Sequence, residues 1–206
     1  IGDCSRILAN FYLQDYDLKM KDICDSLDAK YVRFADDQII YAKSLDDAKN
    51  ILFSASRELL RVNLNLNSSK VKEFRTIQQF NEYWSFELFD LLNNNDTDSI
   101  NKAVEKYLYN LNNQLKFRDT SVLKRLLRTD FKLIKPEYRL QILAKFFNPD
   151  FLATLNLWHF KKIREKVNND DEFFGELDNL ISQVPFNAFH YNLLSFYEKE
   201  RPDYDF

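Results

Sequence analysis

The chain has 206 residues, of which 45% are apolar and 16% aromatic, so it can build one or two domains with a buried core. Cys4 and Cys24 are too few for a disulfide framework, and no apolar run reaches the length of a membrane span, which excludes disulfide-rich secreted and membrane-embedded classes. The formal net charge of -3 excludes a uniformly basic nucleic-acid-binding protein. We expect a soluble cytoplasmic protein with no membrane partner, and because it has two glycines we expect helices to dominate.

The first predicted element is a helix over residues 5–24. Asp3 or Ser5 can cap its start. Apolar residues recur along it at helical spacing, namely Ile7, Leu8, Phe11, Tyr12 and Tyr16. On the residues alone, Asp3 and Ser5 are helix caps, and Asp17 lies on a solvated or structural face.

Residues 31–42 predict a tight hairpin, because β-branched and aromatic residues flank the short polar break at Asp36 and Asp37. A hairpin that needs only a turn usually has Asn-Gly or Asp-Gly there, and this one has no glycine. Two adjacent carboxylates repel each other, and Mg²⁺ can compensate them because it prefers oxygen ligands. Without further context, a solvent-exposed turn with two acids explains the same residues.

Two more elements complete the predicted α+β layer. Residues 44–60 predict a helix, with Ser44 as its cap and Asp47 as the partner in a capping box. Residues 63–67 alternate Asn and Leu, which predicts a half-buried strand. Helices beside these strands predict an α+β fold for this part of the chain.

From residue 78 onward the sequence pattern predicts helices. The polar run at 93–98 is the best domain boundary, so we predict one domain over 1–92 and a second over 93–206. Roughly six helices in series predict an all-α helical bundle or α-solenoid. The prolines at 136, 149 and 185 each suit the first turn of a helix.

Charge is distributed unevenly over the second domain. Residues 115–166 hold 13 Lys and Arg against 5 Asp and Glu, whereas residues 167–206 hold 9 acids and 2 bases. One helix is predicted to carry a basic outer face that can contact phosphates or can simply be solvated, formed by Lys124, Arg128, Lys132 and Lys135. Trp158 has Lys161, Lys162 and Arg164 close by and can stack on a base or belong to the core.

Three motifs in the first third of the chain resemble those of reverse transcriptases, in the order and at the spacing of that family. Phe34-Ala-Asp-Asp37 is similar to the Tyr-Ala-Asp-Asp hairpin. Upstream, Ile1-Gly-Asp-Cys-Ser-Arg-Ile-Leu-Ala-Asn-Phe-Tyr-Leu13 is similar to the helix that precedes that hairpin. Downstream, Leu60-Arg-Val-Asn-Leu-Asn-Leu-Asn-Ser-Ser-Lys70 is similar to the motif that follows it. Such a triple is far more specific than one short motif.

The resemblance implies roles for the hairpin and the third motif. The fold would be part of a polymerase palm followed by a helical thumb-like or helical-repeat region. Asp36 is then a catalytic Mg²⁺ or Mn²⁺ ligand, with Asp37 as a weaker ligand or a neighbouring charge. Lys70 can protonate the pyrophosphate leaving group or hold a phosphate, and a solvated surface lysine explains it equally well.

The resemblance also implies substrate contacts from the first motif. In the family this helix lies beside the incoming nucleotide and the template. Gly2 would let backbone approach the substrate closely, and Ser5, Arg6 and the ring of Phe34 are the other candidate contacts. Arg6 stands where many family members have proline, and Ser-Arg is more similar to bacterial abortive-infection and other defence-associated reverse transcriptases.

The function implied is transfer of nucleotides from dNTPs to a nucleic-acid or protein primer, with RNA template or DNA as partner. The family's first catalytic aspartate and its fingers are not found in this sequence, so we expect a piece of a longer polymerase, inactive without the remainder of that chain. Assembly into a homo-oligomer and template dependence stay open. The alternatives are a catalytically dead palm remnant on a helical interaction scaffold, and another two-metal phosphoryl transferase such as a cyclase or primase.

Overall fold

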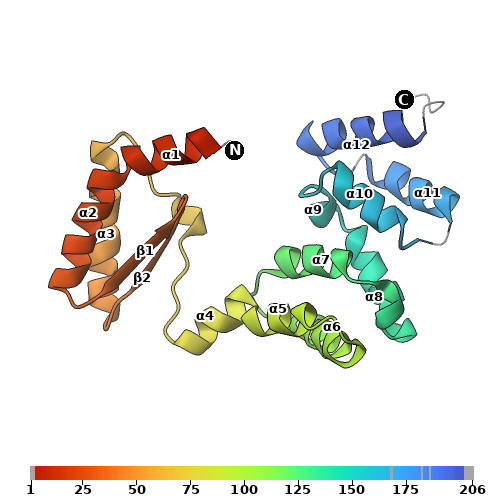
Figure 1. Cartoon of the computed structure of the whole chain (residues 1–206), viewed down its shortest axis with the longest axis horizontal. Coiled ribbons are helices and arrows are strands. Elements are labelled where there is room, and N and C mark those ends of the chain that lie inside the picture. Colours follow the sequence, from red (N-terminus) through yellow and green to blue (C-terminus); the bar gives the residue numbers. More distant parts are fainter. Residues whose placement is uncertain (1–2, 168, 182, 186, 202–206) are drawn as a thin grey trace. The chain divides into compact units, whose positions relative to one another are not determined.

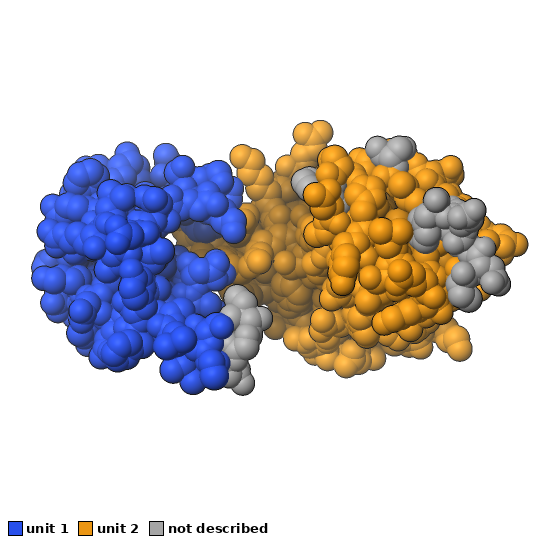
Figure 2. Space-filling model, turned by 90° about the horizontal axis from the view of Figure 1, so that it is seen from above, with its two compact units in different colours: residues 1–75 blue, residues 76–206 orange. Residues whose placement is uncertain are grey.

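The computed structural model describes residues 3–167, 169–181, 183–185 and 187–201, apart from the side chains of Asp3 and Arg6. These residues are mostly helical and hold one small antiparallel sheet, so the α+β expectation is confirmed at this level. The chain divides into two compact units, residues 1–75 and 76–206 (Figures 1 and 2). Each unit has a hydrophobic core of its own.

Unit 1 is a two-stranded hairpin covered on one face by helices (Figure 1). Its elements are α1 (Asp3–Tyr12), α2 (Gln14–Ser26), β1 (Lys30–Phe34), β2 (Asp37–Tyr41), α3 (Leu45–Arg61) and the short 3₁₀ helix η1 (Ser68–Lys70). The core lies where α2 and α3 meet the hairpin, and Met20 and Ile51 are fully buried there. Because only one sheet face is covered, alternate strand residues point into this core.

The predicted helix over 5–24 is two helices, which break at Leu13. Ser5 lies inside α1 rather than before its first residue, so it is not the cap. Within unit 1, Ile7, Leu8 and Phe11 of α1 are exposed, by 67%, 68% and 75%. The apolar spacing therefore predicted the helix correctly but did not predict which residues this unit buries.

The strand predicted over 63–67 is not formed. Asn63 instead takes a left-handed backbone conformation with φ of 55°. The N–H groups of Asn63 and Leu64 donate to the carbonyls of Leu60 and Leu59, which closes the end of α3. Helix termination uses the backbone groups that strand pairing would need, and Leu66 still packs against the core.

The start of α3 has the predicted Ser44 cap, but the Asp47 carboxylate binds the Ser44 hydroxyl rather than the Ser44 backbone N–H that a capping box would use. The Ser44 hydroxyl accepts a hydrogen bond from the Asp47 N–H at 3.0 Å and donates to the Asp47 carboxylate at 2.6 Å. This satisfies one of the N–H groups that a helix leaves unpaired at its first turn.

Unit 2 consists of helices packed around an aromatic-rich core (Figure 1). Its elements are α4 (Ile77–Trp84), α5 (Phe86–Asn93), α6 (Thr97–Asn112), α7 (Asp119–Arg128), η2 (Phe131–Leu133), α8 (Pro136–Phe146), α9 (Pro149–Leu152), α10 (Leu157–Arg164), α11 (Asp170–Ile181) and α12 (Asn187–Glu200). Pro136 and Pro149 open their helices as predicted. Within the described residues, no helix has both the length and the apolar character needed to cross a membrane.

The units divide after Arg75, which is earlier than the boundary expected after residue 92. The predicted helix over 78–92 is broken at Ser85, whose left-handed φ of 59° separates α4 from α5. Leu88 and Leu92 of α5 are buried in the core of unit 2 against α6 and α7. Burial of these two leucines places α5 in the helical unit, although the polar loop follows it.

Candidate functional site

The hairpin carries the two adjacent acids at its tip, as predicted. β1 pairs with β2 so that Phe34 lies opposite Asp37, which leaves Ala35 and Asp36 as a two-residue turn. Ala35 has a φ of 55°, a region that side chains disfavour and that glycine usually occupies in such turns. Strained backbone of this kind is concentrated at functional sites, although it does not by itself identify one.

Residues of β1 alternate between the two faces of the hairpin. Tyr31 and Arg33 point toward α2, whereas Val32 and Phe34 are 60% and 81% exposed. Asp36 and Asp37 are also exposed. The acids therefore lie at a tip that a ligand can reach, beside an exposed aromatic ring at Phe34.

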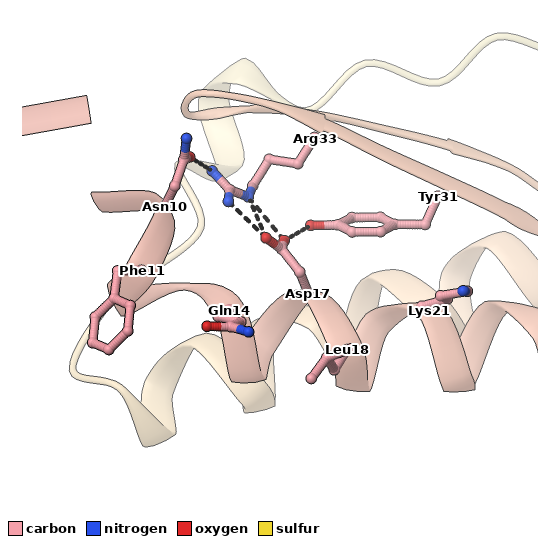
Figure 3. Close-up of a pocket in the computed structure, with 8 residues that line it drawn as sticks. All are labelled: Asn10, Phe11, Gln14, Asp17, Leu18, Lys21, Tyr31 and Arg33. Atoms are coloured by element: carbon pink, nitrogen blue, oxygen red, sulfur yellow. Dashed lines mark hydrogen bonds and ion pairs between the residues drawn. The ribbon is translucent and has the colours of Figure 1, made fainter. Parts of the chain in front are cut away.

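An ion pair fastens β1 to α2 directly behind the tip (Figure 3). The Arg33 guanidinium donates to both carboxylate oxygens of Asp17, with Nη2 to Oδ2 at 2.6 Å and Nε to Oδ1 at 2.8 Å. The third guanidinium nitrogen, Nη1, donates to the carbonyl of Ala35 at 2.7 Å. Arg33 thus joins the turn backbone to a helix, and a two-point ion pair fixes orientation as well as distance.

The same carboxylate holds Tyr31, whose hydroxyl donates to Asp17 Oδ1 at 2.8 Å (Figure 3). Partial burial raises the pKa of Asp17, but the hydrogen bonds from Arg33 and Tyr31 and the Arg33 charge outweigh it, so this pKa lies below its usual value. Burial raises the pKa of Tyr16 to about 12, and its hydroxyl donates to the Gln38 side chain on β2 at 2.5 Å. These contacts give Asp17 a structural role, which is one of the roles that the sequence suggested.

An open pocket of about 700 Å³ lies next to this ion pair (Figure 3). Asp17 and Arg33 line it together with Phe11 of α1 and Lys21 of α2. The acids at the hairpin tip are not among its lining residues. The ion pair was not among the sequence-predicted site residues, although Arg33 at an inward position of a strand was a signal that a buried partner had to exist.

The hairpin acids have the donor chemistry that Mg²⁺ or Mn²⁺ prefers, since one or two carboxylates commonly hold Mg²⁺ with substrate phosphates. Among the described residues, no group of three or more His, Cys, Asp or Glu side chains gathers as a metal site. The metal role of Asp36 and Asp37 therefore stays a prediction.

Two more of the predicted residues of unit 1 are described by the structure. Lys70 ends η1 and is exposed, and Ser5 is exposed on α1. Gly2 and the side chain of Arg6 lie outside the described residues, so their predicted substrate contacts stay predictions.

The predicted basic face over Lys124, Arg128, Lys132 and Lys135 does not exist as one helix face. α7 ends at Arg128, Lys132 lies in η2, and Lys135 precedes α8. Lys135 pairs with Glu105 at 3.1 Å, and this hydrogen bond raises the pKa of Lys135. The stripe needed one continuous helix over 124–135, and α7 ends before it reaches Lys132 and Lys135.

Lys124 and Arg128 remain one turn apart on α7, and the packing of α7 against α10 brings Arg128 to Trp158 and Lys124 to the carbonyl of Thr154. The Arg128 guanidinium carbon lies 5.3 Å from the centre of the Trp158 ring, and Lys162 Nζ lies 6.0 Å from it. Trp158 is 42% exposed, so it is not a core residue. The sequence placed Lys162 close to Trp158, and only the packing of α7 against α10 adds Arg128 to them.

Comparisons with protein-family models, with curated proteins and with solved structures find no match for this chain.

Proposed function

We propose that the chain belongs to a reverse transcriptase-like polymerase that transfers nucleotides from dNTPs to a primer, with the hairpin acids as its metal ligands. One structural observation carries the proposal, which is that Asp36 and Asp37 occupy the exposed tip of an antiparallel hairpin. The motifs on either side of this hairpin occur in the order that the family has. The similarity to abortive-infection enzymes extends the proposal to bacterial anti-phage defence.

The supporting geometry is the anchoring of the turn. A metal-binding turn must hold its carboxylates in place before substrate arrives, because displacement of a reacting group by even about 1 Å is costly. Arg33 binds the Ala35 carbonyl on one side and Asp17 on the other, so the turn is tied to α2. The acids themselves stay exposed and available to a ligand.

In the proposed reaction, the 3′-oxygen of the primer forms a bond to the α-phosphorus of a dNTP while the bond from that phosphorus to pyrophosphate breaks. A bound Mg²⁺ or Mn²⁺ supplies charge neutralisation and activation of the hydroxyl. Asp36 would be the direct ligand of that cation and Asp37 its neighbour. Lys70 is the candidate proton donor to the leaving pyrophosphate, and the hydroxyl proton passes to solvent.

The test compares the intact protein with its Asp36→Asn/Asp37→Asn variant. Each is incubated with dNTPs and Mg²⁺ or Mn²⁺, with and without RNA template and primer, and the products are separated on a gel. We expect DNA synthesis by the native protein and a loss of at least about 100-fold in the variant, since the substitutions remove metal-held charge stabilisation. Dependence on template then separates copying from untemplated addition.

A matched control is the Asp22→Asn/Asp25→Asn variant, which loses the same two charges from exposed positions of α2. It should retain activity. Absence of product from the folded native protein under every condition would leave the scaffold alternative, in which the palm is catalytically dead. Synthesis that survives the hairpin substitutions would assign the chemistry to other residues.

A further inference from the structure

Trp158 lies among cations from two helices of unit 2. Lys124 and Arg128 come from α7, and Lys162 follows Trp158 by one turn on α10. We call these four residues the α7/α10 face. The two helices pack against each other, so the grouping is a product of the fold rather than of a single helix (Figure 1).

The charges of this face are only partly neutralised by the contacts that the structure shows. Lys162 pairs with Glu165 at 2.6 Å. Lys124 donates to the backbone carbonyl of Thr154 at 2.8 Å, and Arg128 lies over the Trp158 ring. Neither of these two contacts is with a carboxylate. Among these contacts, Glu165 is therefore the one acid that pairs with any of the three cations of this face.

The electrostatics of His159, next to Trp158, agree with this grouping. Burial lowers the pKa of His159, and the charges of Lys124 and Arg128 lower it further. Its Nδ1 accepts a hydrogen bond from the Asn156 N–H at 3.2 Å, as part of the capping box of α10. Both effects disfavour the charged imidazole, and the contacts of His159 with Asn156 position the start of α10.

We infer that the α7/α10 face binds single-stranded nucleic acid, with Trp158 stacking on a base while the surrounding cations contact phosphates. An exposed indole beside cations matches the two components of non-specific single-strand binding, which are stacking on an aromatic ring and attraction to the backbone. In a duplex the bases stack on one another, so fewer base faces are accessible to the Trp158 ring than in a single strand. An acidic peptide would satisfy the cations and leave the ring without a partner.

The site is independent of the metal chemistry proposed for the hairpin, because all its residues lie in unit 2. Oligonucleotide binding without dNTPs or metal tests the α7/α10 face, whereas DNA synthesis by the Asp36→Asn/Asp37→Asn variant tests the hairpin. Failure of either inference can then be recognised without the other.

The first measurement is binding of a labelled oligothymidylate of about 15 nucleotides to the whole chain, at several salt concentrations. Arg128→Ala/Lys162→Ala should weaken binding about 10-fold or more and reduce the slope of log affinity against log salt by about 1.4, or about 0.7 for each lost phosphate contact. Lys102→Ala/Lys145→Ala removes the same charge from exposed positions on α6 and α8 and should change the slope far less.

The second measurement detects the stacking directly. The chain has two tryptophans, so Trp84→Phe leaves Trp158 as the sole emitter. Adding the oligonucleotide should quench its emission, and Trp158→Leu should weaken binding about 10-fold while preserving an apolar side chain. Circular dichroism of each variant establishes that it is folded.

Several outcomes would overturn the inference. Failure of the folded native chain to bind at low salt would do so, and so would equal losses in the paired variants on α7/α10 and on α6/α8. Binding of polyglutamate as tight as that of the oligonucleotide, or of duplex DNA without quenching of Trp158, would show that the face attracts charge and does not stack on bases.

Discussion

At the tip of the hairpin, Ala35 adopts a backbone conformation that glycine adopts without strain. The Arg33 guanidinium donates to its carbonyl, and this contact helps hold the turn in place. The lack of glycine was visible in the sequence, but the strain became visible only when the strand register assigned Ala35 and Asp36 to the turn. The strand register depends on which side chains are buried in the core, and the local sequence does not determine which ones these are.

Substitutions at Ala35 should report this strain. Ala35→Gly should stabilise unit 1 by about 0.5–1 kcal/mol, because relief of the left-handed conformation exceeds the added chain entropy of glycine. Ala35→Val should destabilise it by more than about 1 kcal/mol, since branching at Cβ worsens the same conformation. Urea unfolding followed by far-ultraviolet circular dichroism measures both.

The control is Ala48→Gly in α3, where glycine should cost about 0.5–1 kcal/mol because the helix has an ordinary backbone. A loss of stability in Ala35→Gly similar to that in Ala48→Gly would show that the turn is not strained.

Among the elements, β1 and α2 are joined by the pair between Arg33 and Asp17, whose side chains are 8% and 31% exposed. Removing Asp17 would leave a buried guanidinium without its charged partner. The folded-state pKa of Asp17 is depressed, so the stability it contributes is present above the unfolded value of 3.8 and is lost as pH falls through the folded value.

Asp17→Asn should therefore destabilise unit 1 at about pH 7 by roughly 1–2 kcal/mol after solvent screening is allowed for. The difference between wild type and variant should shrink as the pH falls below 3.8 and through the lower folded-state pKa of Asp17, because the wild-type carboxyl then loses its charge as well. Thermal unfolding at several pH values tests this. Asp22→Asn, at an exposed position of the same helix, should show no such convergence, and a constant difference for Asp17→Asn would contradict the role assigned to the pair.

Element boundaries show where local patterns were insufficient. The apolar spacing and the Ser44 cap predicted α3, because capping and periodicity act within a few residues. The alternation over 63–67 predicted a strand that does not form, because Asn63 closes α3 instead. A strand needs a partner from elsewhere in the chain, and alternation cannot supply one.

At the scale of the whole molecule, the two units have separate cores, and both tryptophans lie in unit 2. Tryptophan emission therefore reports the unfolding of unit 2, whereas far-ultraviolet circular dichroism reports both units. Separate cores predict that a substitution in one unit changes mainly that unit's transition.

Ser44→Ala should lower the stability of unit 1 by about 1 kcal/mol through loss of the α3 cap. It should shift the dichroism transition without moving the tryptophan transition. Asn101→Ala should move the tryptophan transition, because the buried Asn101 amide donates to the carbonyls of Thr97 and Leu133 and accepts from the Lys135 N–H. An equal shift of both signals by Ser44→Ala would show that the units unfold together.

Local sequence patterns were enough to predict the hairpin with its acidic tip, the helical character of the second half, and several of the residues that begin helices. These features depend on residues close together in the chain, so their physics is local. Tertiary structure alone decided the pairing of Arg33 with Asp17, the placement of α5 in unit 2, and the meeting of Arg128 with Trp158. Each of these depends on burial and packing between distant segments, which determine the partner of a charged or aromatic side chain.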